Sequence, residues 1–363
     1  MRLNEIDLLR VLAILMVILR HVIIIDPHPP TILAPLVNAG WAGVDLFFVL
    51  SGFLISGLLF SEFQSTGGIR FRRFFVRRAI RILPPYCILL LITVACRLIQ
   101  QPTEHVETLG RLRNDVLFIQ SYREGTWGHF WSLSVEEHFY ILLPLCLFVL
   151  LQKYGHFKQL PGLFLVVAPL ILAARIATWY WISPFNWYTH LFPTHLRIDS
   201  LLFGVILGYY YRLHRKRVWE PLRKRAVVIL ATSLAVLSPL LFLEQSNAFM
   251  YTVWFSFLYL GFAGLLFCAL HWEVGRTGIL AAVSKLGAHS YSIYLWNVPA
   301  VAIVKSLGGT VPEYIALNLV LGVGMSYAVE KPSLWVRERL FAGAAPENTI
   351  VRNVSKQLVV SPK

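Results

Sequence analysis

Hydrophobic residues along this chain gather in long runs, separated by short polar breaks or breaks that contain Pro and Gly. A helix of about 20 apolar residues is long enough to cross the roughly 30 Å hydrocarbon core of a bilayer. About ten runs approach this length, at residues 6–25, 41–61, 80–99, 131–151, 160–180, 198–212, 226–243, 251–271, 288–305 and 313–330. The pattern predicts an all-α, polytopic integral membrane protein with about ten transmembrane helices.

The composition excludes an ordinary soluble domain. Hydrophobic residues make up 57% of the 363 residues and charged residues only 14%, whereas about 25% of the residues of a soluble domain are charged. The run at 6–25 does not resemble a cleavable signal, because its apolar part is too long and contains charged side chains. We therefore expect it to remain in the mature protein.

The basic residues predict the orientation of the spans. The chain carries 33 Lys and Arg against 19 Asp and Glu, a formal charge of +14. With a cytoplasmic amino terminus, most of these basic residues fall in cytoplasmic loops, as the positive-inside rule requires. We expect both termini in the cytoplasm, the inner membrane as the location, and no nucleic-acid partner. The amphipathic stretch 109–122 is interpreted as an interfacial or re-entrant helix, because a further crossing there would invert every later span.

The domain organisation is predicted to be simple. Residues 1–340 form one transmembrane domain, and residues 341–363 form a short, disordered cytoplasmic tail. No metal site is expected, because the candidate ligands lie on different helices without a ligand-spacing pattern. The cysteines lie singly within apolar runs and are interpreted as small hydrophobic residues: Cys87, Cys96, Cys146 and Cys268.

Arg10 and His21 are polar residues inside the first apolar run. They are eleven residues apart, which at 100° per residue brings both side chains to one helix face, separated along the axis by roughly 16 Å. Arg10 has an alternative interpretation as a snorkelling anchor, and His21 as an interfacial residue near the helix exit. In the functional interpretation, one face of this helix carries a cation near the cytoplasm and an imidazole near the outer surface.

A second polar group precedes the third run. It contains the arginines Arg72, Arg73, Arg77, Arg78 and Arg81. Arginines on the cytoplasmic flank are what the positive-inside rule predicts. The functional alternative is an anion site, since guanidinium groups bind phosphate well and Arg78 and Arg81 would share a helix face.

Acidic residues enter the predicted spans from the outer side. Glu136 and Glu137 lie in the fourth run, where a central charge costs roughly 3 kcal/mol. Asp45 lies in the second run, and Arg197 and Asp199 lie in the sixth, where an internal ion pair is the structural alternative. By depth, these residues and His21 form a candidate catalytic cluster on the outer side, opposite the arginines.

An aromatic cluster precedes Arg197 along the chain. It comprises Trp179, Tyr180, Trp181, Trp187 and Tyr188. Such a cluster is typical of the interfacial belt of a membrane protein, which is the interpretation we favour. The alternative is a platform on which a sugar stacks.

These residues occur in motifs that resemble the acyltransferase 3 family of membrane acyltransferases over almost the whole chain. Seven motifs occur in family order: Arg10 with His21, GVDLFFVLSGFLI from Gly43, RRAIRILPPY from Arg77, WSLSVEEHFYILLP from Trp131, RIDSLLFG from Arg197, SYSIYLWNVP from Ser290, and EKP from Glu330. The departures are Leu8 and His138, where the family often has Gly and Gln, and Asn297, where it usually has a histidine.

The resemblance implies transfer of an acyl group, commonly acetyl, from cytoplasmic acyl-CoA to a sugar hydroxyl of a cell-surface or secreted glycan. It implies that the pair Arg10 and His21 is essential. Some relatives carry an additional hydrolase-like domain, and this chain is similar to the stand-alone form. The partners expected are therefore acyl-CoA as donor substrate, a glycan or other hydroxyl acceptor and the lipid bilayer, with no permanently bound cofactor.

The mechanism suggested by these residues begins with the phosphates of acyl-CoA among the arginines and the pantetheine arm along the first helix past Arg10. His21 would act as general base, with Glu136 or Asp45 orienting it and Arg197 or a helix dipole stabilising the oxyanion. The residues expected to bind substrate are Glu137, Arg197 and Asp199. An acyl-histidine intermediate is an equal alternative. Acylation of a cytoplasmic small molecule or lipid-linked sugar, and a transporter or flippase, are the other functions considered.

Overall fold

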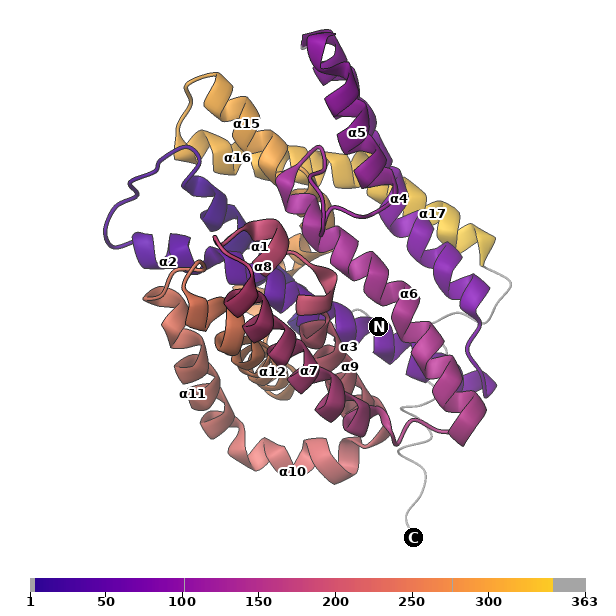
Figure 1. Ribbon diagram of the computed structural model, residues 1–363. Coiled ribbons are helices and arrows are strands. Elements are labelled where there is room, and N and C mark those ends of the chain that lie inside the picture. The colour runs from indigo at the N-terminus through magenta and orange to yellow at the C-terminus, as the bar shows by residue number, and fades with distance from the viewer. Residues whose placement is uncertain (1–3, 101, 276, 342–363) are drawn as a thin grey trace.

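The computed structural model describes residues 4–100, 102–275 and 277–341, and every regular element in those ranges is a helix (Figure 1). The longer α-helices are α1 (Asn4–Val22), α3 (Gly43–Thr66), α4 (Phe71–Gln100), α5 (His105–Val116), α6 (Trp131–Tyr154), α7 (Leu160–Trp181), α9 (Ile198–Leu213), α11 (Ala226–Leu237), α12 (Phe255–His271), α15 (Asn297–Ser306), α16 (Val311–Met325) and α17 (Lys331–Leu340). Shorter elements are α2 (Ala34–Ala39), η3 (Gly128–Phe130), α8 (Trp187–His190), α10 (Glu220–Leu222), α13 (Gly278–Ser284), α14 (Ser290–Leu295) and η10 (Ser326–Glu330). The predicted all-α class is confirmed.

Within the described ranges, six helical stretches are long and apolar enough to cross a membrane. They are Ala34–Thr66, Phe71–Gln100, Gly128–Tyr154, Leu160–Trp181, Arg215–Leu241 and Met250–His271. The other predicted runs are also helical, as α1, α9, α14 with α15, and α16, but these helices are shorter or carry several charges. The protein is therefore a multi-pass membrane protein, while the count of ten spans remains a prediction.

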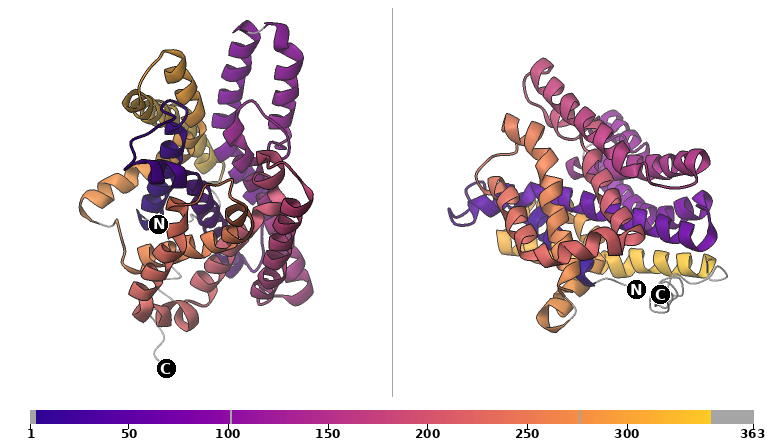
Figure 2. Two further views of the ribbon diagram at one scale, coloured as in Figure 1. Left: turned by 60° about the vertical axis from the view of Figure 1, so that its left-hand side comes forward. Right: turned by 90° about the horizontal axis from the view of Figure 1, so that it is seen from below.

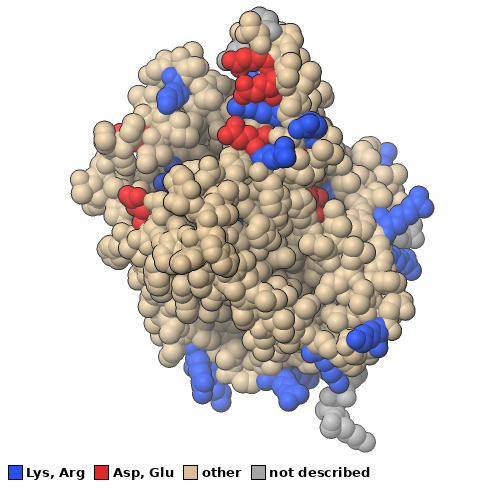
Figure 3. Space-filling model, viewed as in Figure 1, with Lys and Arg blue, Asp and Glu red and all other residues tan. Residues whose placement is uncertain are grey.

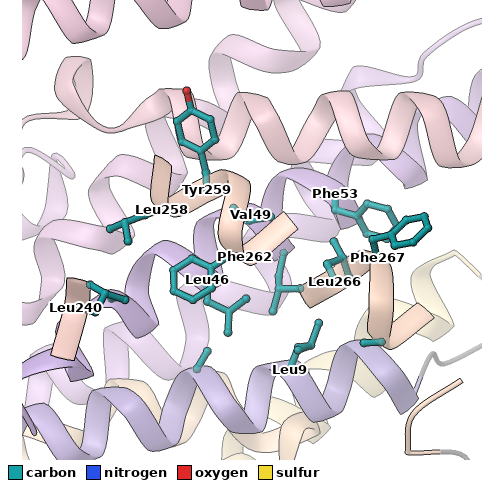
Figure 4. Packing of buried hydrophobic residues seen from close by; sticks show 14 of the residues in the cluster. Leu9, Leu46, Val49, Phe53, Leu240, Leu258, Tyr259, Phe262, Leu266 and Phe267 are labelled. Atoms are coloured by element: carbon teal, nitrogen blue, oxygen red, sulfur yellow. The ribbon is translucent and has the colours of Figure 1, made fainter. Parts of the chain in front are cut away.

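The centre of the fold is a hydrophobic cluster between α1, α3, α9 and α12. Leu46, Val49 and Phe53 from α3 meet Phe262 from α12 there, and Leu9 from α1 lies on the other side (Figure 4). Between membrane helices such contacts are stabilised by van der Waals packing, because lipid tails are as apolar as these side chains. The α3 and α9 backbones approach very closely, because Gly52 and Gly204 leave room that a side chain would fill. This contact fixes α3, which carries Val44 and Ser51 to the candidate site described below.

The end of α4 and the whole of α5 form a helical hairpin that stands out from the rest of the molecule (Figure 2). The amphipathic stretch predicted at 109–122 is thus partly confirmed as helix, since α5 ends at Val116 and a loop follows. Its membrane placement remains a prediction.

Charged side chains are distributed unevenly on the face shown in Figure 3. Lys and Arg gather along the lower edge, near α10, and the visible Asp and Glu lie in the upper half together with the α4–α5 hairpin. The predicted orientation leads us to expect such an enrichment of Lys and Arg on the cytoplasmic side, and the face shown also carries Lys and Arg in its upper half and at its right edge. The cytoplasmic placement of both termini remains a prediction, and the predicted tail lies outside the described residues from 342 onward.

Candidate functional site

His21 lies in the last turn of α1, on the same helix as Arg10, so the predicted sharing of one face follows from the observed helix. The Nδ1 atom of His21 is 2.9 Å from the Val17 carbonyl oxygen. A carbonyl only accepts hydrogen bonds, so Nδ1 carries the proton and donates it. In the neutral ring, Nε2 therefore holds the lone pair that a base or a nucleophile needs.

A cavity of about 160 Å³ lies beside His21. Its largest lining side chains are aromatic, and a few polar side chains lie among them. Its lining consists of Val17, Arg20, His21, Trp41, Val44, Gly128, His129, Trp131, Trp187, Phe192, Gln245 and Tyr294. An apolar chamber with few polar groups is the usual form of a small-molecule site.

Several of these lining residues were not predicted from the sequence, and His129 is the most notable. It lies in η3, immediately before α6, and is 7% exposed. Its Nε2 is 3.2 Å from the Leu295 carbonyl oxygen, and Tyr294 donates a hydrogen bond to the His129 carbonyl at 2.8 Å. The sequence signal that could have pointed to His129 is the WSLSVEEHFYILLP motif, which begins two residues later at Trp131.

Glu136 belongs to a second polar group, on the Arg10 side of the site. Its carboxylate lies 3.9 Å from Arg78 on α4 and accepts hydrogen bonds from Ser51 on α3 and Tyr140 one turn on. The Arg78 guanidinium also lies 3.8 Å from the centre of the Tyr140 ring, a cation–π contact. Glu136 is thus held by helices α3, α4 and α6 together.

Arg10 and Arg81 extend this second group. Arg81 interacts electrostatically with Arg10 and Arg78, and Arg10 interacts with Glu136. Arg10 also donates to Asp7 at 3.1 Å. We call Arg10, Arg78, Arg81 and Glu136 the arginine cluster. The cluster agrees with the predicted common face of Arg78 and Arg81. In the part of the chain that the structure describes, the buried Nε of Arg78 has no hydrogen-bond partner.

The other predicted arginines lie around this cluster. Arg73 and Arg77 contact the ring of Phe341 at 5.8 and 5.5 Å, and Arg72 is exposed. Glu137 is close enough to Arg78 and Glu136 to interact with both electrostatically. The five arginines therefore occupy more than one face of α4, and only two belong to the cluster.

The geometry differs from the carboxylate–histidine arrangement expected from the sequence. Within the described ranges, neither Glu136 nor Asp45 makes a hydrogen bond or ion pair with His21, whose ring is oriented by the Val17 carbonyl instead. The physical reason is depth, because Glu136 interacts with Arg10, and Arg10 lies about three helical turns from His21. Glu136 and His21 were both predicted to lie near the outer surface, but the two side chains are not neighbours in the structure.

Asp45, Arg197 and Asp199 form a buried ion network. The Arg197 Nη2 atom is 2.9 Å from both oxygens of Asp45, and Arg175 on α7 donates to Asp199 at 2.6 Å. Their side chains are at most 2% exposed. The internal pair considered for Arg197 and Asp199 is thus replaced by two pairs between different helices. Arg197 also lies 4.1 Å from the Phe255 ring centre and 5.3 Å from that of Trp131.

Asn297, which stands where a histidine was expected, links three helices. Its side-chain amide donates to the Tyr314 hydroxyl at 2.8 Å, and Tyr314 donates to the Ile18 carbonyl of α1 at 3.1 Å. Both side chains are completely buried. This position therefore supports α1 one turn below His21.

A larger and more open hollow of about 660 Å³ lies between α5 and the loop before α8. Arg111 pairs with Glu107 and Glu124 at 2.6 and 3.2 Å, which braces the wall of this hollow. Burial, with the nearby Glu124 carboxylate, raises the pKa of Tyr188 to about 12, so its hydroxyl is neutral and able to donate. Tyr188 lines this hollow and Trp187 lines the cavity beside His21, so the two spaces adjoin at α8.

Comparison with known proteins gives matches over most of the chain. A family model described as an acyltransferase domain matches residues 3–330. The chain is 28% identical over 351 residues to the O-acetyltransferase OatA of Staphylococcus aureus (strain NCTC 8325 / PS 47), covering 87% of this chain and 53% of that protein. It is 28% identical over 334 residues to the peptidoglycan O-acetyltransferase OatA of Listeria monocytogenes serovar 1/2a (strain ATCC BAA-679 / EGD-e), covering 82% and 49%. The chain spans about half the length of these relatives, and no solved structure matches it.

Proposed function

Because the chain belongs to the acyltransferase 3 family, we propose that it is a membrane O-acyltransferase that moves an acyl group, acetyl in the first instance, from acyl-CoA to a hydroxyl of a cell-envelope glycan. The observation that carries this proposal is the arrangement along α1. One end presents a histidine with a free Nε2 lone pair to an aromatic cavity, and the other end lies in the arginine cluster. The names of both relatives support acetyl as the group, and the name of the Listeria monocytogenes relative supports a glycan as the acceptor.

The arginine cluster is proposed to bind the phosphates of acyl-CoA. Guanidinium groups bind phosphate with two parallel hydrogen bonds, and charge-assisted bonds of this kind are about twice as strong as neutral ones. Arg78 has an unpartnered buried Nε, and its ion pair with Glu136 is long at 3.9 Å. Glu136 is therefore proposed to position Arg78, in place of the earlier hypothesis that it orients His21.

The pantetheine arm is proposed to follow α1 from Arg10 to His21. Its extended length is comparable to the roughly 16 Å between these residues along the axis. The thioester then reaches the cavity, while the adenine nucleotide remains on the side of the arginines. This geometry keeps the donor's nucleotide at one end of α1 and brings its thioester to the acceptor at the other end.

The transfer step assigns a role to His21 and Arg20. The His21 Nε2 takes the proton of the acceptor hydroxyl, whose oxygen forms a bond to the thioester carbonyl carbon. The carbon–sulfur bond then breaks, and the CoA thiolate receives the proton from the imidazolium. Arg20 lines the same cavity and is proposed to stabilise the oxyanion. An acyl-histidine intermediate uses the same Nε2 atom and differs in the order of bond formation.

The acceptor is proposed to enter through the open hollow beside α5. Tyr188 faces the hollow and Trp187 faces the cavity, on either side of α8. A glycan chain that rests in the hollow would therefore place one sugar unit past Trp187, inside the cavity. This reading favours the sugar platform for Trp187 and Tyr188 over a purely interfacial belt. Residues in the buried ion network take no part in this step.

The first test is acetyl-CoA turnover by the purified protein in nanodiscs with a cell-wall glycan extract. Wild type should release CoA and label the glycan, whereas His21→Ala should do neither, and Arg10→Ala should show a raised KM for acetyl-CoA. Lys216→Gln, an exposed substitution outside the site, serves as the control. Equal activity of His21→Ala and wild type would refute the proposal, and glycan movement across the bilayer without CoA release would favour the transporter.

A further inference from the structure

Two polar groups in the cavity beside His21 lack hydrogen-bond partners among the described residues. The Nε2 of His129 donates to the Leu295 carbonyl, so its Nδ1 carries the lone pair, and that buried Nδ1 has no hydrogen-bond partner. The indole N–H of Trp41, which lines the same cavity, is also buried without a partner. Leaving a buried polar group unsatisfied is costly, and a bound ligand is one explanation for such a group.

The two groups are complementary to a hydroxyl. His129 Nδ1 can only accept a hydrogen bond, and Trp41 Nε1 can only donate one. A hydroxyl both donates and accepts, so hydroxyls of a bound ligand satisfy both groups without introducing a charge. A carboxylate or an ammonium ion satisfies only one of them.

The size of the cavity limits the part of the ligand that enters it. A cavity of about 150 Å³ in another protein holds benzene, so the 160 Å³ here has room for one six-membered ring. The hydroxyl that faces His21 and the hydroxyls that face His129 and Trp41 can then belong to the same ring. The aromatic walls, including Trp131 and Trp187, suit the apolar faces of such a ring.

We propose that His129 and Trp41 form a hydroxyl-recognition subsite that binds the acceptor sugar through a ring hydroxyl other than the one that receives the acyl group. This inference depends on the proposed function, which identifies the acceptor as a sugar. It makes His129 and Trp41 specificity residues, because they select a ring that carries a second hydroxyl at the correct position. The chemical class is a neutral pyranose unit of the glycan.

The test compares sugars and variants in one cycle. The probes are the methyl glycoside of N-acetylglucosamine and its three monodeoxy analogues, and the variants are His129→Gln, His129→Asn and Trp41→Phe. Gln keeps a donor near the His Nε2 position, Asn keeps an acceptor near Nδ1, and Phe keeps an aromatic ring without the N–H. His28→Gln, an exposed substitution outside both the cavity and the hollow, is the control.

Wild type should lose about tenfold in kcat/KM for one deoxy analogue that can still be acylated, the size expected from one hydrogen bond. His129→Gln should handle that analogue and the parent sugar equally well, and His129→Asn should restore discrimination. A purely structural role predicts instead that every sugar is affected equally by the substitution, and that result would overturn the subsite.

A binding measurement separates this inference from the proposed function. Calorimetric titration of the same glycosides into His21→Ala nanodiscs requires no transfer, and the loss of one hydroxyl should weaken binding about tenfold only when His129 and Trp41 are present. Binding without any transfer by wild type would contradict the proposed function and leave the subsite standing. Transfer by wild type with no discrimination in either assay would overturn the subsite alone.

Discussion

Asp45→Asn tests whether the carboxylate that we first considered catalytic is structural instead. The substitution keeps the size of the side chain and removes the charge that neutralises Arg197, with both groups at most 2% exposed. At 2.9 Å and an effective dielectric constant of about 20, the Coulomb attraction is roughly 6 kcal/mol. Desolvation offsets part of this, and breaking a buried pair typically costs about 3 to 5 kcal/mol.

We therefore expect Asp45→Asn to lower the free energy of unfolding by about 3 to 5 kcal/mol. Unfolding by denaturing detergent, followed by tryptophan fluorescence, measures this change. The double variant Asp45→Asn with Arg197→Met should recover much of the loss, because no uncompensated charge then remains. Asp199 and Arg175 also act on Asp45 electrostatically, so variants of the second pair should not be additive with these.

The activity assay then decides between the two roles. Folded Asp45→Asn protein, measured below its unfolding transition, should retain CoA release within a few-fold of wild type. A stability change below about 1 kcal/mol together with a loss of turnover above a hundredfold would refute the structural assignment and return Asp45 to the catalytic group.

Three further outcomes are expected. Gly52→Ala should destabilise the protein by about 1 to 3 kcal/mol, because the added carbon would overlap the Leu201 carbonyl. Gly57→Ala, where the added carbon has ordinary space, is the control. Equal stability of the two variants in detergent unfolding would contradict the close packing. Arg78→Gln should raise the KM for acetyl-CoA at least about tenfold with little change in kcat in steady-state assays, and an unchanged KM would exclude it from the donor site. Arg20→Gln should lower kcat about a hundredfold at saturating donor and acceptor, and undiminished kcat would remove it as the oxyanion partner.

The sequence was sufficient to predict the helices because each depends on local pattern. Apolar runs long enough for a bilayer all became helical, and a spacing of eleven residues correctly predicted that Arg10 and His21 share a face of α1. The common face of Arg78 and Arg81 followed from the same periodicity. These relations lie within one helix, where geometry is fixed by the backbone.

Relations between helices could not be predicted in this way. Membrane depth was estimated from the distance along each span, but helices cross at angles, so Glu136 met Arg78 and Arg10 rather than His21. Arg197 likewise paired with Asp45, far away in sequence, and left Asp199 to Arg175. His129 was missed because a single histidine in a three-residue helical turn before α6 carries no periodic signal.

The small volume beside His21 links donor and acceptor selection. If the proposed sugar ring fills most of the 160 Å³, an acyl chain that arrives on the thioester has to use the same space. Each methylene added to the acyl group therefore displaces part of the sugar, so a short acyl group is favoured by the presence of the acceptor itself. The length of the acyl group and the size of the acceptor are then limited by the same cavity volume. A variant that enlarges the cavity would allow both longer acyl groups and larger acceptors.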